Sequence, residues 1–305
     1  MSRSPLSLAA AAQAAMPNAK IVGTRLATVP GEFDAAEITL ANGEQLLVQV
    51  NRTELAGAAA QANATNVKAL QQLPTQFKLP FRIPELKGMA KLDAGGRAFV
   101  TTILPGVPVQ LDTLKPGPGL AASIGRAIAA IHEIPTELAE HLALDVFTAE
   151  EYRQRHLTNL DVVAETGKVP TVLLARWEKA LDNVALWRFN PVFVHGDLGS
   201  EYLLTDGEKV TGMDGWANAR VADPADDLAW LVATASPEAA DSVLEAYQLR
   251  RTETRDVGLL ERALLISELA IARWLQYGVR ENNPAIVSDG TQMLAELAAA
   301  LTADP

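Results

Sequence analysis

The stretch from Pro191 to Trp230 constrains this chain most, because its short apolar runs are interrupted by clustered polar residues. The first run ends abruptly at His195-Gly196-Asp197. Two further runs, Tyr202–Leu204 and Val210–Met213, flank an Asp206-Gly207 pair. Apolar runs on either side of an Asp-Gly pair are typical of a β-hairpin. The sequence therefore predicts a small hairpin soon after the His-Gly-Asp triplet.

This hairpin would position two carboxylates. Asp197 follows the first run and Asp214 follows the last, so we expect both at one open end of a single ribbon, near enough to share a site. A helix start follows at Asp223-Pro224, since Asp is a favoured N-cap and Pro is favoured in the first turn. Polar residues at the mouth of a hairpin, supported by a capped helix, predict an active site.

The ordered motifs of this stretch resemble those of the aminoglycoside and macrolide phosphotransferases, small-molecule kinases with a protein-kinase-like fold. The family pattern is HGDLxxxN, a hairpin, G-x-I-D-W and then DPxxDLA. The matching segments here are 195–198, 212–216 and 223–229. The triplet HGD alone is a weak indicator of this family, whereas the three motifs in this order are a specific one. The resemblance covers most of the chain and is stronger in its second part.

Charge and composition limit the classes of partner. The chain has 305 residues, a formal net charge of −11 and a pI near 4.9. Nucleic-acid-binding proteins usually present a basic face, so we expect no nucleic-acid partner. The acidic balance is compatible with a cationic small-molecule substrate, although net charge also simply keeps proteins soluble. There is no cysteine, which excludes disulfides, thiolate catalysis and zinc–thiolate sites.

No apolar run approaches the ~20 residues needed to cross a bilayer, so we expect no membrane span. The N-terminus has Arg3 followed by Ala-rich sequence, which superficially resembles a signal peptide. Gln13 interrupts that run, and Ser4-Pro5 forms a good N-cap and first-turn pair. The segment therefore predicts an amphipathic helix of a cytoplasmic protein.

Hydrophobic periodicity changes along the chain. The elements expected in the first third are strands at 20–27, 35–40, 45–50, 88–91 and 97–104 and a helix at 53–73. From Gly119 onward the pattern is mostly helical, and the expected helices are 120–132, 149–164, 170–186, 226–235, 236–247, 252–278 and 284–301. The predicted class is α+β, with a small antiparallel sheet lobe at 1–104 and a larger helical lobe at 105–305. This agrees with the two-lobed, protein-kinase-like fold that the resemblance implies.

Phosphoryl transfer needs a carboxylate beside the acceptor hydroxyl, Mg²⁺ held by oxygen ligands, and cations or amides around the phosphates. The resemblance implies that Asp197 is the catalytic carboxylate, which orients the hydroxyl and receives its proton. The alternative is that Asp197 only caps its loop through hydrogen bonds to backbone amides. His195, Asp223 and Asp227 are expected to support this loop rather than to react.

The metal-binding positions depart from the family pattern. The family's metal-binding Asn falls on Tyr202, and a phenol is a poor Mg²⁺ ligand. The metal-binding Asp falls on Gly215, while Asp214 stands one residue earlier. A one-residue offset on a strand reverses the face of the side chain, unless a bulge restores it. Asp214 is therefore the candidate metal ligand, and an exposed turn carboxylate is the alternative.

The first lobe departs from the pattern as well. Gln49 falls where the family has the strand cation that binds the nucleotide phosphates, and Asn63 falls near the helix glutamate that pairs with this cation. An amide can donate a hydrogen bond but cannot neutralise charge. Arg52, three residues on, either reaches in or faces solvent. The resemblance implies a hinge that holds the nucleotide base, formed by Thr101, Thr102, Ile103 and Leu104.

Three functions remain in consideration. The first is an O-phosphotransferase that uses ATP or GTP with Mg²⁺ on a hydroxylated small molecule, with Asp197 as the base. The second is a pseudokinase, a nucleotide- or ligand-binding module without the chemistry; the positions that favour it are Gln49, Asn63, Tyr202 and Gly215. The third, an acyl hydrolase, has no visible Ser-His-Asp arrangement to support it. Retention of Asp197 in an otherwise altered site favours the phosphotransferase.

The family recognises its substrates through acidic or aromatic residues of the C-terminal helices. The corresponding candidates here are Glu261, Glu268, Trp274 and Tyr277. Acidic residues on a helix more commonly form a solvated face, and that is the alternative for this set.

Overall fold

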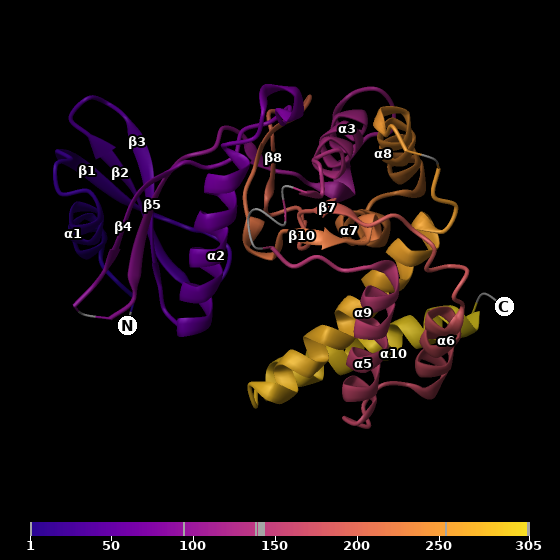
Figure 1. The fold of residues 1–305 in the computed structure, drawn as a ribbon. Coiled ribbons are helices and arrows are strands. Elements are labelled where there is room, and N and C mark those ends of the chain that lie inside the picture. Colours follow the sequence, from indigo (N-terminus) through magenta and orange to yellow (C-terminus); the bar gives the residue numbers. More distant parts are fainter. Residues whose placement is uncertain (1, 94, 138, 140–143, 254, 304–305) are drawn as a thin grey trace.

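The computed structural model describes residues 2–93, 95–137, 139, 144–253 and 255–303. A sheet with one covering helix forms one side of the molecule, and a larger group of helices forms the other (Figure 1). Helix α2, Glu54–Leu70, stands between the two. This arrangement confirms the expected α+β class, with a sheet lobe and a larger helical lobe. The boundary between the lobes at residue 104 stays a prediction.

The sheet lobe contains five antiparallel strands in the order β1-β2-β3-β5-β4. The strands are β1 Ile21–Ala27, β2 Phe33–Leu40, β3 Gln45–Asn51, β4 Leu86–Lys91 and β5 Arg97–Thr102. Helix α1, Pro5–Ala15, covers one face of this sheet. It begins at the N-cap Ser4, whose hydroxyl accepts a hydrogen bond from the Ser7 N–H, as the sequence predicts.

Alternation along β3 decides which side chains face the helical lobe. Leu46, Val48 and Val50 are fully buried in the core that α1 covers. Because successive side chains of a strand point to opposite faces, Leu47 and Gln49 lie on the other face. Both line the space between the lobes. The position of Gln49 thus follows from the two-residue period of the strand.

Helix α2 follows β3 in the chain but packs on the helical lobe. Its N-cap is Thr53, whose hydroxyl accepts a hydrogen bond from the Ala56 N–H. Near its end, Val67 and Leu70 join the main core of the helical lobe. The buried Asn66 Nδ2 donates to the backbone carbonyl of Trp216 over 2.8 Å. These contacts make α2 one wall of the space between the lobes.

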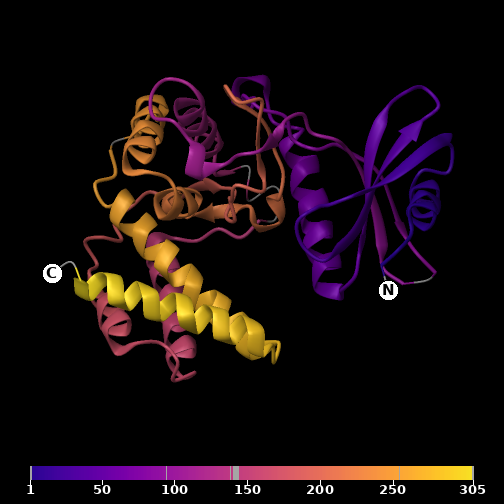
Figure 2. The same cartoon turned by 180° about the vertical axis from the view of Figure 1, so that it is seen from behind.

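The helical lobe has two hydrophobic cores. Its helices are α3 Leu120–His132, α5 Ala149–Ala164, α6 Thr171–Asp182, α7 Ala229–Thr234, α8 Pro237–Arg250, α9 Leu259–Arg280 and α10 Pro284–Ala303. Ile124, Ile128 and Ile131 recur at helical spacing on α3 and are fully buried. Full burial of such a side chain stabilises the fold by roughly 1.5–3 kcal/mol. A second core joins α5, α6, α9 and α10, and α10 lies along α9 (Figure 2).

The central stretch forms two small sheets. Their strands are β6 Val107–Pro108, β7 Val192–Val194, β8 Leu203–Thr205, β9 Val210–Met213 and β10 Arg220–Ala222. The predicted hairpin is present as β8 and β9, with β6 beside β8. The expectation that Asp197 and Asp214 end one ribbon is wrong, because β7 pairs with β10 instead. The chain turns away at Gly196, whose φ is +82°.

Several helix boundaries differ from the sequence expectation: the helices expected at 53–73 and 170–186 end early, at Leu70 and Asp182, and the one expected at 236–247 extends to Arg250. Helix α9 begins at Leu259 rather than at Thr252, because Thr252 donates its backbone N–H and its hydroxyl to the Glu133 carboxylate. The helix expected at 226–235 is divided into a 3-10 turn, η4 Pro224–Asp227, and the short α7. Within the described residues, no helix is both long and apolar enough to cross a membrane.

Candidate active site

A cavity of about 380 Å³ lies between the sheet and the central stretch. Its lining includes the predicted nucleotide-binding residues Gln49, Thr101, Thr102, Ile103 and Leu104. It also includes Asn63, Asp197, Tyr202, Asp214 and Gly215. Folding therefore brings the predicted catalytic, metal and nucleotide positions, and all the substituted family positions, to one cavity. The expected supporting residues His195, Asp223 and Asp227 are buried outside its lining.

Asp197 stands on a loop that a buried carboxylate holds in place. Asp227 accepts hydrogen bonds from the backbone N–H groups of His195 and Gly196, each over 2.8 Å. The imidazole of His132 lies 3.2 Å from the same carboxylate and 2.8 Å from the Tyr247 hydroxyl. Burial by itself would raise the pKa of Asp227, but these hydrogen bonds and the neighbouring histidines hold it below its ordinary value. The loop therefore rests on an ionised, hydrogen-bonded carboxylate.

The Asp197 carboxylate faces the open cleft. One of its oxygens accepts a hydrogen bond from Asn218 Nδ2 over 3.2 Å. The surrounding protein desolvates the carboxylate, which raises its pKa, and the nearby charge of Glu201 acts in the same direction. A carboxylate with a raised pKa accepts a proton more readily than an ordinary aspartate. The geometry thus presents a basic oxygen to a bound molecule.

His195 joins the two segments of the site. Its Nε2 donates to the backbone carbonyl of Asp214 over 2.8 Å, and its ring lies 4.7 Å from that of Trp216, centroid to centroid. The side chain is fully buried. This contact ties the loop before Asp197 to the segment after β9.

Asp223 anchors the η4 turn from inside the core. Its Oδ1 accepts the Ala225 N–H, and its carboxylate binds the guanidinium of the fully buried Arg262 over 2.7 and 3.0 Å. Burial raises the pKa of Asp223 to about 6, although the charge of Arg262 opposes the rise. The pair fixes η4, and with it Asp227, against α9.

Asp214 faces the cavity rather than solvent. Its Oδ1 accepts hydrogen bonds from Asn63 Nδ2 over 3.2 Å and from the Gly215 N–H over 2.7 Å. Asn63 Oδ1 in turn accepts the Trp216 N–H over 2.9 Å. The Asn63 amide therefore holds α2 against the segment 214–216.

The resemblance predicts Tyr202 and Gly215 at the two positions where the family has metal ligands. Neither offers a carboxylate or amide side-chain oxygen, and one oxygen of Asp214 already serves Asn63 and Gly215. Among the described residues, no group of three His, Cys, Asp or Glu side chains is arranged to hold a metal ion. Mg²⁺ requires oxygen ligands in near-octahedral geometry. The side chains present do not fit a protein-held magnesium ion.

The charge of the cavity wall differs from that of a triphosphate site. Its described lining contains no Lys or Arg side chain, and its carboxylates are Glu37, Asp197, Glu201 and Asp214. Only Glu37 is neutralised, by Arg25 over 2.7 Å. The phenol of Tyr202 also lies in negatively charged surroundings. Burial raises its pKa most, and the charges of Asp197, Glu201 and Asp214 raise it further, to about 12.

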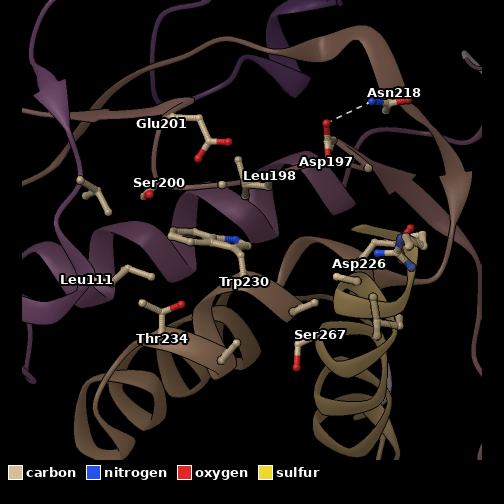
Figure 3. Close-up of a pocket in the computed structure, with 18 of the residues that line it drawn as sticks. Leu111, Asp197, Leu198, Ser200, Glu201, Asn218, Asp226, Trp230, Thr234 and Ser267 are labelled. Atoms are coloured by element: carbon tan, nitrogen blue, oxygen red, sulfur yellow. Dashed lines mark hydrogen bonds between the residues drawn. The ribbon is translucent and has the colours of Figure 1, made fainter. Parts of the chain in front are cut away.

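A second cavity, of about 710 Å³, opens on the other side of Asp197, within the helical lobe. Figure 3 shows the indole of Trp230 standing in it, between the loop of Leu198 and Ser200 and the side chain of Ser267. The lining of both cavities includes Asp197, Glu201 and Asn218. These three side chains form the boundary between the two spaces.

The substrate candidates named from sequence do not line this second cavity. Glu268 accepts hydrogen bonds from Arg176 and from Trp177 Nε1, and Trp274 donates to Asp289. The lining residues of α9 are instead Ile266, Ser267, Ala270 and Arg273. Neither Glu261 nor Tyr277 is among them.

Sequence reasoning missed Glu201, Asn218, Arg155 and Arg273. Glu201 and Asn218 fall inside the stretch from Pro191 to Trp230, between the matching segments, and could have been found there as polar residues near Asp197. Arg155 and Arg273 are single charged residues on amphipathic helices, and no local pattern distinguishes them from a solvated face.

The profile of the phosphotransferase enzyme family matches residues 84–260, more than half of the chain. Among curated proteins, the uncharacterized protein YcbJ of Bacillus subtilis (strain 168) is 30% identical over 120 residues. That match covers 39% of this chain and 39% of YcbJ, so the similar region spans well under half of the relative's length.

Several solved structures share the whole fold. The apoenzyme of macrolide 2'-phosphotransferase MphH from Brachybacterium faecium has a TM-score of 0.78 at 21% identity, covering 95% of this chain and 98% of that chain. The GDP and kanamycin complex of APH(2")-IIIa has a TM-score of 0.78 at 15% identity, covering 97% and 99%. These likenesses confirm the two-lobed, kinase-like fold.

The matched segment runs from the beginning of β4 to the first residues of α9. It contains the Asp197 loop, the β8–β9 hairpin and the η4 turn, whose Asp227 supports that loop. The chain therefore belongs to the phosphotransferase enzyme family.

Proposed function

We propose that this chain is an O-phosphotransferase, which transfers the terminal phosphoryl group of ATP or GTP to a hydroxyl of a small molecule. One observation carries the proposal: Asp197 lines both the cavity between the lobes and the cavity within the helical lobe. A nucleotide in the first and an acceptor in the second would meet at this carboxylate. A cytoplasmic location, where both nucleotides occur, is part of the proposal.

Asp197 would act as the base. The acceptor O–H donates its proton to the carboxylate as its oxygen bonds to the terminal phosphorus. The bond from that phosphorus to the bridging oxygen breaks, and the nucleoside diphosphate leaves. Asn218 holds one oxygen of Asp197, which leaves the other for the acceptor. The raised pKa of Asp197 matches it to this task.

The cavity between the lobes is the proposed nucleotide site. Ile103 and Leu104 lie just beyond the last residue of β5, at the passage from the sheet to the helical lobe. Structures similar to this chain include complexes with GDP and a ternary complex with streptomycin and ATP. The side chains that line this cavity do not fit a protein-held magnesium ion.

A second function has its own support. Transfer of a phosphoryl group requires neutralisation of developing charge, and the described cavity lining supplies carboxylates but no Lys or Arg. Tyr202 also stands at a family ligand position. These observations favour a module that binds a ligand between its lobes without transferring phosphate.

Thermal unfolding with ATP and GTP, each with Mg²⁺ and with EDTA, separates the two functions. A ligand at a hundredfold excess over Kd stabilises the native state by about 2.7 kcal/mol. The phosphotransferase proposal expects stabilisation by ATP or GTP, followed by nucleoside diphosphate release that depends on an added hydroxylated acceptor; the comparison of Mg²⁺ with EDTA measures whether binding needs the ion. Asp197→Asn should keep the stabilisation and lose the release. Stabilisation by neither nucleotide, or release that persists in Asp197→Asn, would overturn it.

A further inference from the structure

The cavity within the helical lobe has a basic end that the proposed chemistry does not use. Helix α5 contributes Arg155, His156 and Asn159 to it, and helix α9 contributes Ser267 and Arg273. The two helices pack against each other in the second core of this lobe. Asp197 and Glu201 reach the same cavity from the loop after β7. The cavity therefore carries carboxylates on its loop wall and guanidinium groups on its helical wall.

The two arginines are not neutralised by the protein. Within the described residues, no carboxylate lies within ion-pair distance of Arg155 or Arg273, and the guanidinium of Arg155 lies over the Phe147 ring, 5.2 Å from its centroid. Asp226, one of the acids that line the cavity, instead accepts hydrogen bonds from Arg220 Nη2 over 2.6 Å and from the Tyr152 hydroxyl. This end of the cavity thus has uncompensated positive charge.

His156 supplies a buried hydrogen-bonding atom at the same place. Only 5% of the residue is exposed, and its ring packs between those of Tyr152 and Trp187. Its Nε2 is buried and has no hydrogen-bond partner within the described protein. A buried polar atom left unpaired destabilises the fold, and a bound ligand that pairs with it would remove this cost. Burial, and then the charges of Arg273 and Arg155, lower the pKa of this ring to about 3, so the imidazole is neutral at pH 7.

We propose that Arg155, Arg273 and the His156 imidazole form a subsite for an oxyanion, a carboxylate or phosphate group carried by the acceptor. Guanidinium groups bind such anions through paired N–H donors, and a neutral imidazole N–H adds a further donor. The acceptor is then a hydroxylated acid rather than a polycation. Its anionic group binds at the helical wall while a hydroxyl reaches Asp197.

This assignment of the anion to the acceptor rests on the proposed function, but binding at the subsite requires no nucleotide. An anionic acceptor replaces the cationic substrate with which the acidic net charge of the chain is compatible. The local charge of a site, rather than the net charge of the whole chain, decides which ligand enters it. The same local charge disfavours aminoglycosides, which would bring ammonium groups against Arg155 and Arg273.

The test is thermal unfolding without nucleotide, at constant ionic strength, with gluconate, with its uncharged counterpart glucitol, and with inorganic phosphate. The variants are Arg155→Gln/Arg273→Gln and the control Arg280→Gln, an exposed arginine on α9 outside the cavity. We expect at least one anion to raise the Tm of the wild type and of Arg280→Gln by several degrees, and glucitol not to do so. The double variant should keep the unliganded Tm, since both arginines are exposed, and lose the rise.

Gluconate and phosphate distinguish the two sources of the anion. A rise with gluconate alone assigns a carboxylate, and a rise with phosphate alone assigns a phosphate ester. If no anion exceeds glucitol, or if the double variant keeps the full rise, the subsite is refuted. Because no nucleotide is present, this result is independent of whether the chain transfers phosphate.

Discussion

The aromatic ring of Tyr202 occupies the space in which a side chain at position 215 would have to stand. A Cβ added to Gly215 would lie 2.5 Å from Cδ1 of Tyr202, and the φ of Gly215 is +86°, a conformation that few other residues adopt. Positions 202 and 215, which the resemblance predicts to be metal-ligand positions in the family, are therefore sterically coupled. A bulky ring at one of them requires glycine at the other.

This coupling predicts non-additive effects of substitution. Gly215→Asp should destabilise the fold by about 1–3 kcal/mol, because the new side chain meets the Tyr202 ring and the backbone is strained. In Tyr202→Asn/Gly215→Asp the ring is absent, so part of this loss should be regained. Urea unfolding of both single variants and the double variant measures the interaction. Strictly additive free energies would contradict the steric coupling.

The support of the Asp197 loop predicts a second effect. Asp227→Asn replaces one acceptor oxygen by an NH₂ group, which then faces the backbone N–H of either His195 or Gly196, because each of these N–H groups donates to a different oxygen. We expect a loss of about 1–3 kcal/mol for each buried donor left unpaired. The exposed Asp241→Asn on α8 is the matched control and should leave the free energy of unfolding unchanged. Equal stability of the two variants would show that Asp227 does not hold the loop.

Removal of the buried cation predicts a pH-dependent effect. Arg262→Met leaves Asp223 buried without its partner, which should cost about 3–5 kcal/mol at pH 8. The pKa of Asp223 is already about 6 and should rise further in the variant. A folded-state pKa raised above the unfolded one lets the native state bind a proton that the unfolded state does not. The loss should therefore shrink as pH falls from 8 to 5.

Chemical unfolding at these two pH values checks this prediction, and the exposed Arg280→Met is the control. A loss that is independent of pH would mean that Asp223 does not become protonated in the variant.

The buried imidazole of His156 predicts acid sensitivity. Its folded-state pKa of about 3 lies below the ordinary value of 6.5. As pH falls below 6.5, the unfolded state binds a proton that the folded state does not, so stability decreases by up to ~1.4 kcal/mol per pH unit. His156→Phe keeps an aromatic ring between Tyr152 and Trp187 and removes this proton uptake. The slope of unfolding free energy between pH 6.5 and 4.5 should be smaller in the variant than in the wild type.

Equal slopes in the two proteins would assign the acid sensitivity to other groups, such as His132, which is also a buried histidine. Its pKa is also lowered by burial.

Much of the fold follows from local sequence. The Asp206-Gly207 pair specifies the hairpin, and Ser4 and Asp223 cap the elements that they precede, because each signal depends on residues a few positions apart. The alternation of β3 similarly places Gln49 on the cavity side. Where such local signals compete with tertiary contacts, as Thr252 does by binding Glu133, the expected boundary moves.

The sequence by itself determined the α+β class, the motif order and the position of Asp197 after a buried strand, since short-range periods and turn residues encode these. Only the tertiary structure decided that Asp214 faces Asn63, that Tyr202 fills the space beside Gly215, and that Arg155 and Arg273 share a cavity. Each of these relationships joins residues that are well separated in sequence. Their geometry depends on how whole helices and strands pack, which no local pattern specifies.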